Sequence, residues 1–167
     1  MKIKYCLVWM GIVLSAITVG CSSSMGLTKE EKATKAAALH VAIEKRTFIV
    51  EVDKALPMGG SARVLTSPYS LELNEEKVKS YLPYFGRAYS LPYGGGEGLI
   101  FDSVMTDYQS SFDKKGKTLI EFKTQSKEDQ FVYRIHISPN GTASIDVTPM
   151  NRQPISFTGN AFPKIDK

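Results

Sequence analysis

Cysteine is nearly absent from this chain of 167 residues, which has two copies, Cys6 and Cys21. Residues 22–167 contain no thiol, which excludes a disulfide, a thiolate metal site and a cysteine nucleophile from that part of the chain. Histidine is as scarce, and neither His40 nor His136 has a partner at metal-ligand spacing. We therefore expect no metal site, no cofactor and no catalytic residues, so an enzyme is the least favoured class.

The chain also has little net charge once its first segment is set aside. Lys2 and Lys4 precede an apolar run, residues 7–19, that is too short to span a bilayer as a helix. Without these two lysines the 21 basic side chains become 19, against 17 acidic ones. This small excess forms no basic cluster in the sequence, so we expect no nucleic-acid partner.

The first segment has the layout of a targeting signal. It ends at Thr18-Val19-Gly20, and Cys21 and three serines follow. This arrangement resembles a bacterial lipoprotein signal, with Thr18 where that pattern usually has leucine; a generic signal peptide or an uncleaved anchor is the alternative. We expect removal of residues 1–20, a lipid on Cys21 that makes a membrane the first partner, and a tether over 21–27. Residues 28–167 then form one domain.

Two kinds of periodicity follow the tether. Thr28 and Glu31 have the spacing of a helix capping box and precede an alanine-rich run, which predicts a helix over 28–45. From Thr47 onward apolar and polar residues alternate, as in half-buried strands. These patterns predict an all-β fold with one N-terminal helix, in which the strands form an antiparallel barrel or a β-sandwich. An α+β roll is the further alternative. The clearest strand segments are 47–53, 63–65, 69–73, 78–82, 99–108, 119–124, 131–137 and 155–157.

One turn permits a register prediction. A two-residue loop would place Ile137 opposite Ser144 and mix apolar with polar side chains on one face. A three-residue loop over 139–141 would place Ile137 opposite Ala143. Its proline suits the start of a type I turn, and Gly141 suits the left-handed position. We therefore predict a three-residue hairpin loop with a bulge at Gly141.

The most unusual stretch is Tyr81–Phe101, which repeats Leu-Pro-Tyr at a spacing of nine and contains a glycine run. The run lacks the Gly-Lys-Ser/Thr ending of a phosphate-binding loop. Arg87 and Arg152 each lie in an aromatic, proline-bearing motif. Their guanidinium groups could stack on tyrosine or hold a carboxylate or phosphate, or they could lock the two motifs together. The candidate ligand-binding residues are Tyr81, Tyr84, Phe85, Arg87, Tyr89, Tyr93 and Arg152.

Two motifs, Leu82–Ser90 followed by Gly95-Gly96, and Asn151–Gly159, resemble a family of Bacteroidetes lipoproteins known as domain of unknown function 4251. The resemblance implies a lipocalin-like barrel behind a lipoprotein signal, in the outer membrane of the cell envelope, and carries over no catalytic residue. The resemblance links export to the cell surface with an acidic signal just after the lipidated cysteine. Serines follow Cys21 instead, which favours the periplasmic side. Ser103 lies in a tripeptide that resembles the O-glycosylation acceptor of this group.

Two functions remain: a non-catalytic binding module, which the sequence favours, and an interaction or structural module as the alternative. A binding module would hold a small or lipidic ligand inside the barrel or beneath residues 81–98; a cavity lined by Phe48, Ile135 and Tyr84 would favour it. An envelope interaction or structural module would instead use exposed aromatic side chains against a protein partner, and a filled barrel would favour it. The acidic pair at residues 128–129 lies in a predicted turn, where we expect it to face solvent.

Overall fold

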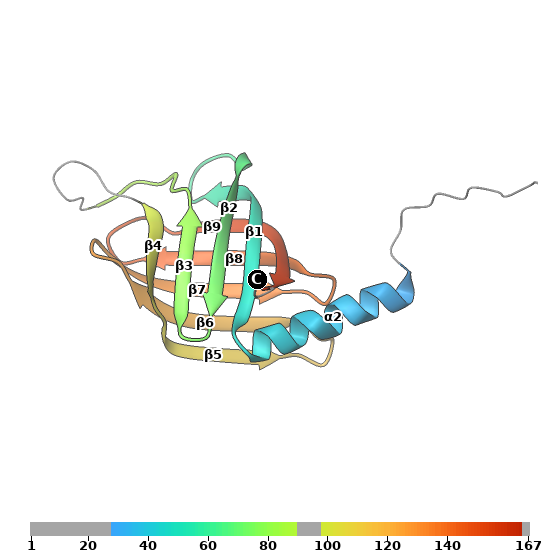
Figure 1. Cartoon of the computed structure of the whole chain (residues 1–167). Coiled ribbons are helices and arrows are strands. Elements are labelled where there is room, and N and C mark those ends of the chain that lie inside the picture. The colour runs from blue at the N-terminus through green and yellow to red at the C-terminus, as the bar shows by residue number, and fades with distance from the viewer. Residues whose placement is uncertain (1–27, 90–97, 165–167) are drawn as a thin grey trace, which may run out of the picture.

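The computed structural model describes residues 28–89 and 98–164 (Figure 1). Its helix, α2 (Lys29–Glu44), begins where the capping box predicts. The Thr28 hydroxyl accepts a hydrogen bond from the Glu31 amide, and the Glu31 carboxylate accepts one from the Thr28 amide. Its buried residues, Leu39, Ala42 and Ile43, all lie in its C-terminal half, which packs on the sheet. No helix in these two ranges is long and apolar enough to cross a membrane.

Nine strands in the described chain form one antiparallel sheet, in the order β4-β3-β2-β1-β9-β8-β7-β6-β5. Figure 1 shows β1–β4 crossing over β5–β9 at a steep angle, so that the sheet curves into a nearly closed barrel. The predicted fold class, an all-β barrel with one N-terminal helix, is therefore confirmed. The strands are β1 (Thr47–Pro57), β2 (Arg63–Asn74), β3 (Lys77–Leu82), β4 (Leu99–Val104), β5 (Thr106–Phe112), β6 (Thr118–Gln125), β7 (Gln130–Ile137), β8 (Thr142–Pro149) and β9 (Ile155–Pro163).

The predicted hairpin register is confirmed. Ile137 lies opposite Ala143, and Gly141 has a φ of 89°, the left-handed conformation that the three-residue loop requires. The single strand predicted over 99–108 is wrong, because the chain bends at the buried Met105. β4 pairs with β3 whereas β5 pairs with β6, so this bend joins the two edge strands of the sheet.

β2 and β9 also depart from their sequence patterns. β2 joins the segments predicted at 63–65 and 69–73 into one strand that passes through Pro68. β9 continues to Pro163 instead of ending at Phe157, because β1 supplies partners along its whole length and β8 supplies them as far as Asn160.

The barrel interior is filled by its own side chains. Tyr133 and Phe122 stack with ring centroids 5.1 Å apart, and both are fully buried. The Tyr133 hydroxyl lies 3.0 Å from Ser80 Oγ, which in turn donates to the Leu99 carbonyl at 2.7 Å. Because a hydroxyl has one proton and Ser80 uses its own on Leu99, Tyr133 is the donor to Ser80. A polar group at the centre of the barrel is thus satisfied internally.

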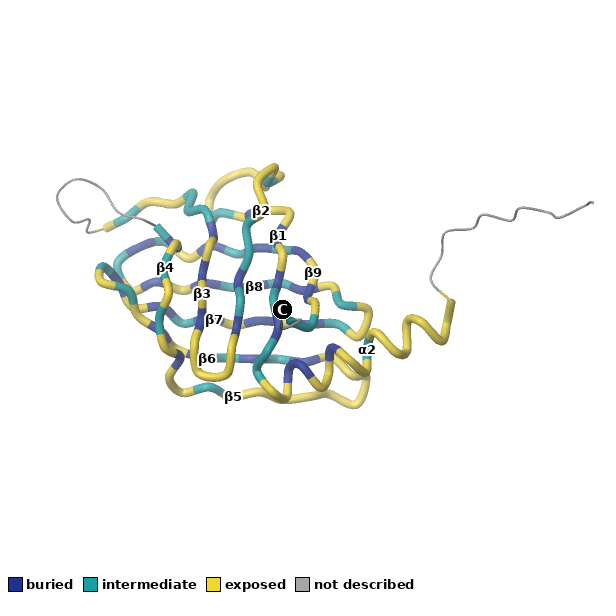
Figure 2. The backbone as a smooth tube through the Cα atoms, viewed as in Figure 1, coloured by how far each residue is buried: buried dark blue, intermediate teal, exposed yellow. Residues whose placement is uncertain are grey.

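Two of the three residues whose cavity would have favoured a ligand, Phe48 and Ile135, are part of this core. Neither has any exposed surface, whereas a cavity of water size beside them would leave some of their surface accessible. Figure 2 shows buried residues alternating with exposed or intermediate ones along the strands, as expected of strands that turn one face toward a core. The interior around these two side chains therefore serves stability.

Strands β6–β9 run between two ends of the barrel. We call one the motif end, which comprises residues 84–89, 126–129 and 150–154. The other is the helix end, which comprises α2 and the turns at 113–117 and 138–141. The registers place these groups at opposite termini of the same strands, and Figure 1 shows α2 far from the loop that follows β3.

Candidate functional site

The two motifs singled out in the sequence lie side by side at the motif end. Ala88 and Arg152 form an antiparallel bridge. The Tyr89 amide donates to the Asn151 carbonyl at 2.8 Å, and the Gln153 amide donates to the Arg87 carbonyl at 3.0 Å. Residues 84–89, which have no regular structure of their own, are thus held by backbone hydrogen bonds to the loop between β8 and β9.

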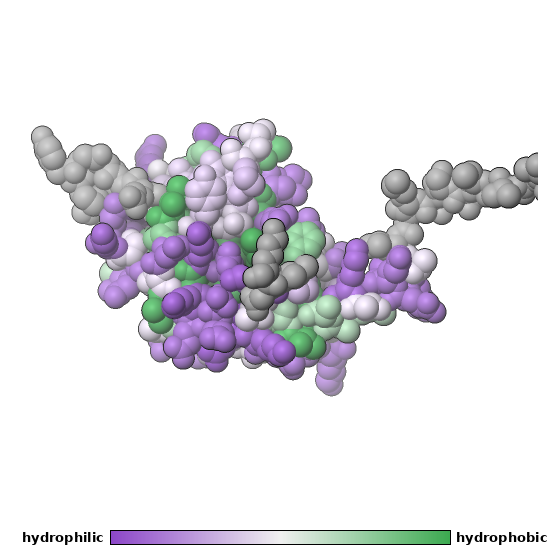
Figure 3. Space-filling model, viewed as in Figure 1, coloured by the Kyte–Doolittle hydropathy of each residue, from purple (hydrophilic) through white to green (hydrophobic). Residues whose placement is uncertain are grey.

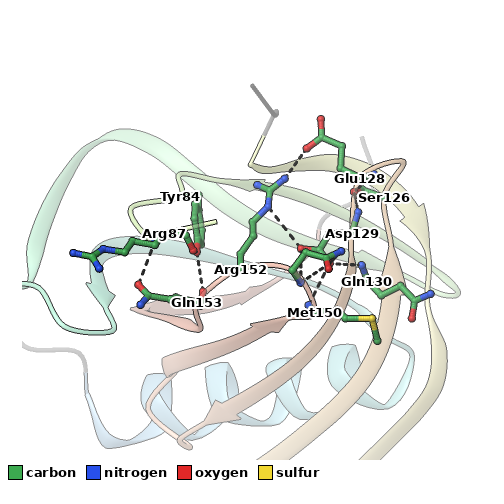
Figure 4. Close-up of polar contacts among 10 residues, drawn as sticks. Tyr84, Arg87, Ser126, Glu128, Asp129, Gln130, Met150, Arg152 and Gln153 are labelled. Carbon is green, nitrogen blue, oxygen red and sulfur yellow. Dashed lines mark hydrogen bonds and ion pairs between the residues drawn. The ribbon is translucent and has the colours of Figure 1, made fainter. Parts of the chain in front are cut away.

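Tyr84 fastens the start of this segment. Its hydroxyl lies 3.0 Å from the Arg87 carbonyl and 2.9 Å from the Gln153 carbonyl, so one proton is shared between two acceptors (Figure 4). Burial raises the pKa of Tyr84, and the nearby Arg152 guanidinium offsets part of that effect. Tyr84 therefore remains a neutral hydrogen-bond donor throughout the physiological pH range.

Arg152 is buried beneath this segment, with a side chain that is 3% exposed. Its Nη2 lies 2.6 Å from Glu128 Oε2, and its Nε lies 3.7 Å from Asp129 Oδ2. The guanidinium carbon is 5.6 Å from the centre of the Tyr84 ring. The charge of Arg152 is compensated inside the protein, so for this residue the geometry favours the lock between motifs over contact with a ligand.

Asp129 is the acceptor at the centre of the cluster. Its side chain is fully buried, so the prediction that it faces solvent is wrong. It accepts hydrogen bonds from the backbone amides of Gln130, Met150 and Asn151 at 2.9–3.2 Å (Figure 4). These donors and Arg152 replace the water that the carboxylate loses on burial. Sequence reasoning missed this role because every partner of the Asp129 carboxylate except the adjacent Gln130 lies 21 or more positions away, and no local pattern marks them.

The remaining candidates that the structure describes are exposed or half-buried. The Arg87 side chain and Tyr89 are exposed, the latter by 71%. Tyr81 is 41% exposed, and its ring lies 5.3 Å from that of Tyr69. Phe85 is half-buried, with an arginine guanidinium 4.7 Å from its ring. Tyr93 and Cys21 lie outside the described residues.

A groove of about 760 Å³ adjoins the motif end. Val104, Phe131 and Met150 supply its apolar walls, and Lys123 and Gln130 are among its polar ones. It connects to the buried cluster through Met150, whose amide is bound by Asp129. The sequence contained no signal for this groove, because its walls come from five strands and are assembled by the curvature of the sheet.

The histidines make no catalytic arrangement within residues 28–89 and 98–164. His136 Nε2 lies 3.9 Å from Asp146 Oδ2, beyond hydrogen-bond distance, and Ser156 donates to the other oxygen of that carboxylate at 2.6 Å. In a nucleophilic triad the histidine lies between the serine and the acid. Here Asp146 lies between His136 and Ser156 instead. His40 stacks on Phe112 at 4.3 Å.

Comparison with known proteins gives a family and a fold. The sequence profile of the domain of unknown function DUF4251 matches residues 30–161. The crystal structure of a DUF4251 family protein from Bacteroides eggerthii is similar, with a TM-score of 0.61 and 18% identity over 78% of this chain and 89% of that one. No curated protein matches the chain. The match covers both motifs and the strands between them, and the chain belongs to the DUF4251 family.

Proposed function

We propose that this protein is a non-catalytic, lipid-anchored protein of the cell envelope that binds a protein partner through its motif end. The observation that carries this proposal is the filled barrel. Phe48, Ile135 and Tyr133 have no exposed surface, so an internal lipocalin-type site has no room beside them. Binding is then a task for the outer surface, where the second of the two functions left open by the sequence places it.

The motif end has the properties of a prepared contact surface. Tyr89 and Arg87 are exposed, and these residue types dominate the energetics of protein interfaces. The backbone beneath them is held by Tyr84, Gln153 and the buried Arg152. A segment that is ordered before binding loses little conformational entropy when a partner arrives. The locking network and the exposed side chains therefore serve one purpose.

The anchor and the location complete the proposal. A lipid on Cys21 would hold the protein to a membrane, and the serines that follow this residue favour the periplasmic side of the outer membrane over the cell surface. The test begins with the mass of the mature chain, which should start at Cys21 and carry the added acyl groups. An unmodified Cys21 would remove the anchor from the proposal.

Photo-crosslinking in the intact envelope tests the partner. A benzoylphenylalanine at Tyr89 should give a discrete crosslinked product, and adding Arg87→Ala should lower its yield by about fivefold, the loss expected of an interface anchor residue. The control position is Lys77, which is exposed at the opposite end of β3. Equal products from the two positions, or none from Tyr89, would contradict a partner at the motif end.

A small or lipidic ligand is the second candidate, and the groove beside Met150 is the observation that favours it. Its volume of about 760 Å³ falls within the range of ligand sites. Native mass spectrometry of the mature protein, purified gently from its own envelope, should then show a discrete added mass. Val104→Arg, which fills the groove from its exposed edge, should remove that mass. A bare mass for the unmodified chain would eliminate this candidate.

A further inference from the structure

The helix end carries an apolar groove that the proposed binding surface does not use. The N-terminal half of α2 stands away from the barrel, and Figure 2 shows exposed residues along it. Between this half, the turn at 138–141 and the end of β9 lies a groove of about 560 Å³. Its walls are apolar, with Ala33, Ala36 and Leu39 on one side and Phe162 and Pro163 on the other. Phe162 is 45% exposed there.

A second hollow lies on the other flank of the same helix. It has a volume of about 260 Å³ and is lined by Ala37, His40, Gly116 and Pro139, among others. The helix therefore rises between two apolar depressions. Figure 3 shows hydrophobic surface where α2 meets the barrel and hydrophilic surface along its projecting half. A broad apolar surface placed against the helix end would cover both hollows together.

Positive charge surrounds these hollows. The exposed lysines of α2 and of the β5–β6 turn are Lys29, Lys32, Lys35, Lys114, Lys115 and Lys117. The carboxylates of the same segments are Glu30, Glu31, Glu44 and Asp113, which leaves an excess of two positive charges. Two of the four carboxylates accept hydrogen bonds from local backbone amides. The rim is therefore complementary to a negatively charged surface.

The position of the chain upstream indicates which surface this is. Cys21 precedes Thr28 by seven residues, and seven residues span at most about 25 Å when fully extended. A lipid on Cys21 thus keeps the start of α2 within that distance of a bilayer. The motif end lies at the far termini of β6–β9, and strands of eight residues span about 26 Å.

We propose that the helix end docks in the interface of an anionic lipid bilayer, with the two apolar hollows over the acyl boundary and the lysines among the phosphate headgroups. This orientation rests on the lipid anchor of the proposed function. It directs the motif end away from the membrane, where a partner can reach it. Apolar contact combined with lysine–headgroup attraction is the usual basis of interfacial binding.

Tryptophan fluorescence tests the orientation cleanly, because the only tryptophan of the chain, Trp9, lies in the segment that we expect to be removed. The mature acylated protein is reconstituted in vesicles of phosphatidylglycerol and phosphatidylcholine with brominated acyl chains. Phe162→Trp places the probe in the groove, and Met58→Trp is the control, since Met58 is 65% exposed and follows the end of β1 beside the motif end. The groove probe should be quenched at least about twofold, and the control probe should not change.

Charge reversal and flotation separate the possible outcomes. Adding Lys32→Glu, Lys35→Glu and Lys115→Glu to the groove probe should abolish its quenching while the protein still floats with the vesicles. Quenching that persists in this variant, equal quenching of both probes, or an unquenched groove probe in floating protein would overturn the docking and leave the anchor intact. Failure of every variant to float would remove the anchor itself. A blue shift of the groove probe without vesicles, rising with protein concentration, would assign the groove to a second copy of the chain and overturn the proposal.

Discussion

Replacing Arg152 by methionine should destabilise the protein strongly, because it removes one side of a buried ion pair. Arg152 is 3% exposed and Glu128 is 21% exposed, with 2.6 Å between their charged atoms. Removing one partner of such a pair costs about 3–5 kcal/mol. Asp129 keeps its backbone donors, and Glu128 can turn toward water, so we expect the lower limit, about 3 kcal/mol. At about 3 °C per kcal/mol for a chain of this size, the Tm falls by about 9 °C.

Arg134→Met is the matched control. Arg134 pairs with Glu121 at 2.9 Å, and both side chains are nearly half exposed. Exposed pairs of this kind contribute about 0.2–1 kcal/mol. Urea and thermal unfolding, followed by circular dichroism, give both free energies of unfolding. If Arg152→Met costs no more than Arg134→Met, the buried cluster does not lock the two motifs, and the account of the motif end as a prepared surface is wrong.

Two further predictions concern the barrel. Gly159 lies opposite Val52 at the bulge of β1, and a Cβ added to it would meet the Glu51 carbonyl and lie 2.7 Å from Val52 Cα. Gly159→Ala should therefore lower the free energy of unfolding, measured by urea titration, by about 3 kcal/mol. An unchanged free energy would contradict this close approach. Burial raises the pKa of Tyr133, which therefore stays protonated in the folded chain when unfolded tyrosine ionises near pH 10. The stability that this group contributes is complete below about pH 10 and is lost above it, by about 1.4 kcal/mol at pH 11. The free energy of unfolding of Tyr133→Phe should therefore fall less steeply above pH 10 than that of the unmodified chain. Equal declines in the two proteins would refute the burial of the Tyr133 hydroxyl.

Local sequence patterns determined most of the elements and one register. The capping residues Thr28 and Glu31 fixed the start of α2, because a helix N-terminus is satisfied by side chains within its own first turn. The loop at 139–141 determined the pairing of Ile137 with Ala143, because a turn of given length and a side-chain period of two leave one register that keeps apolar groups together. The number and alternation of the strands limited the fold to an antiparallel barrel or sandwich.

The tertiary structure decided which residues meet. Met105 separates β4 from β5 because the two halves of that apolar run pair with different neighbours, and no local pattern distinguishes them from a single strand. Asp129 and Arg152 form a buried cluster because strand curvature brings two turns together, whereas in sequence Asp129 looks like a solvated loop charge. The filled interior has the same origin, since the volume left inside a barrel depends on how side chains from opposite walls interdigitate. That packing favours the outside of the barrel over its inside as the candidate binding surface.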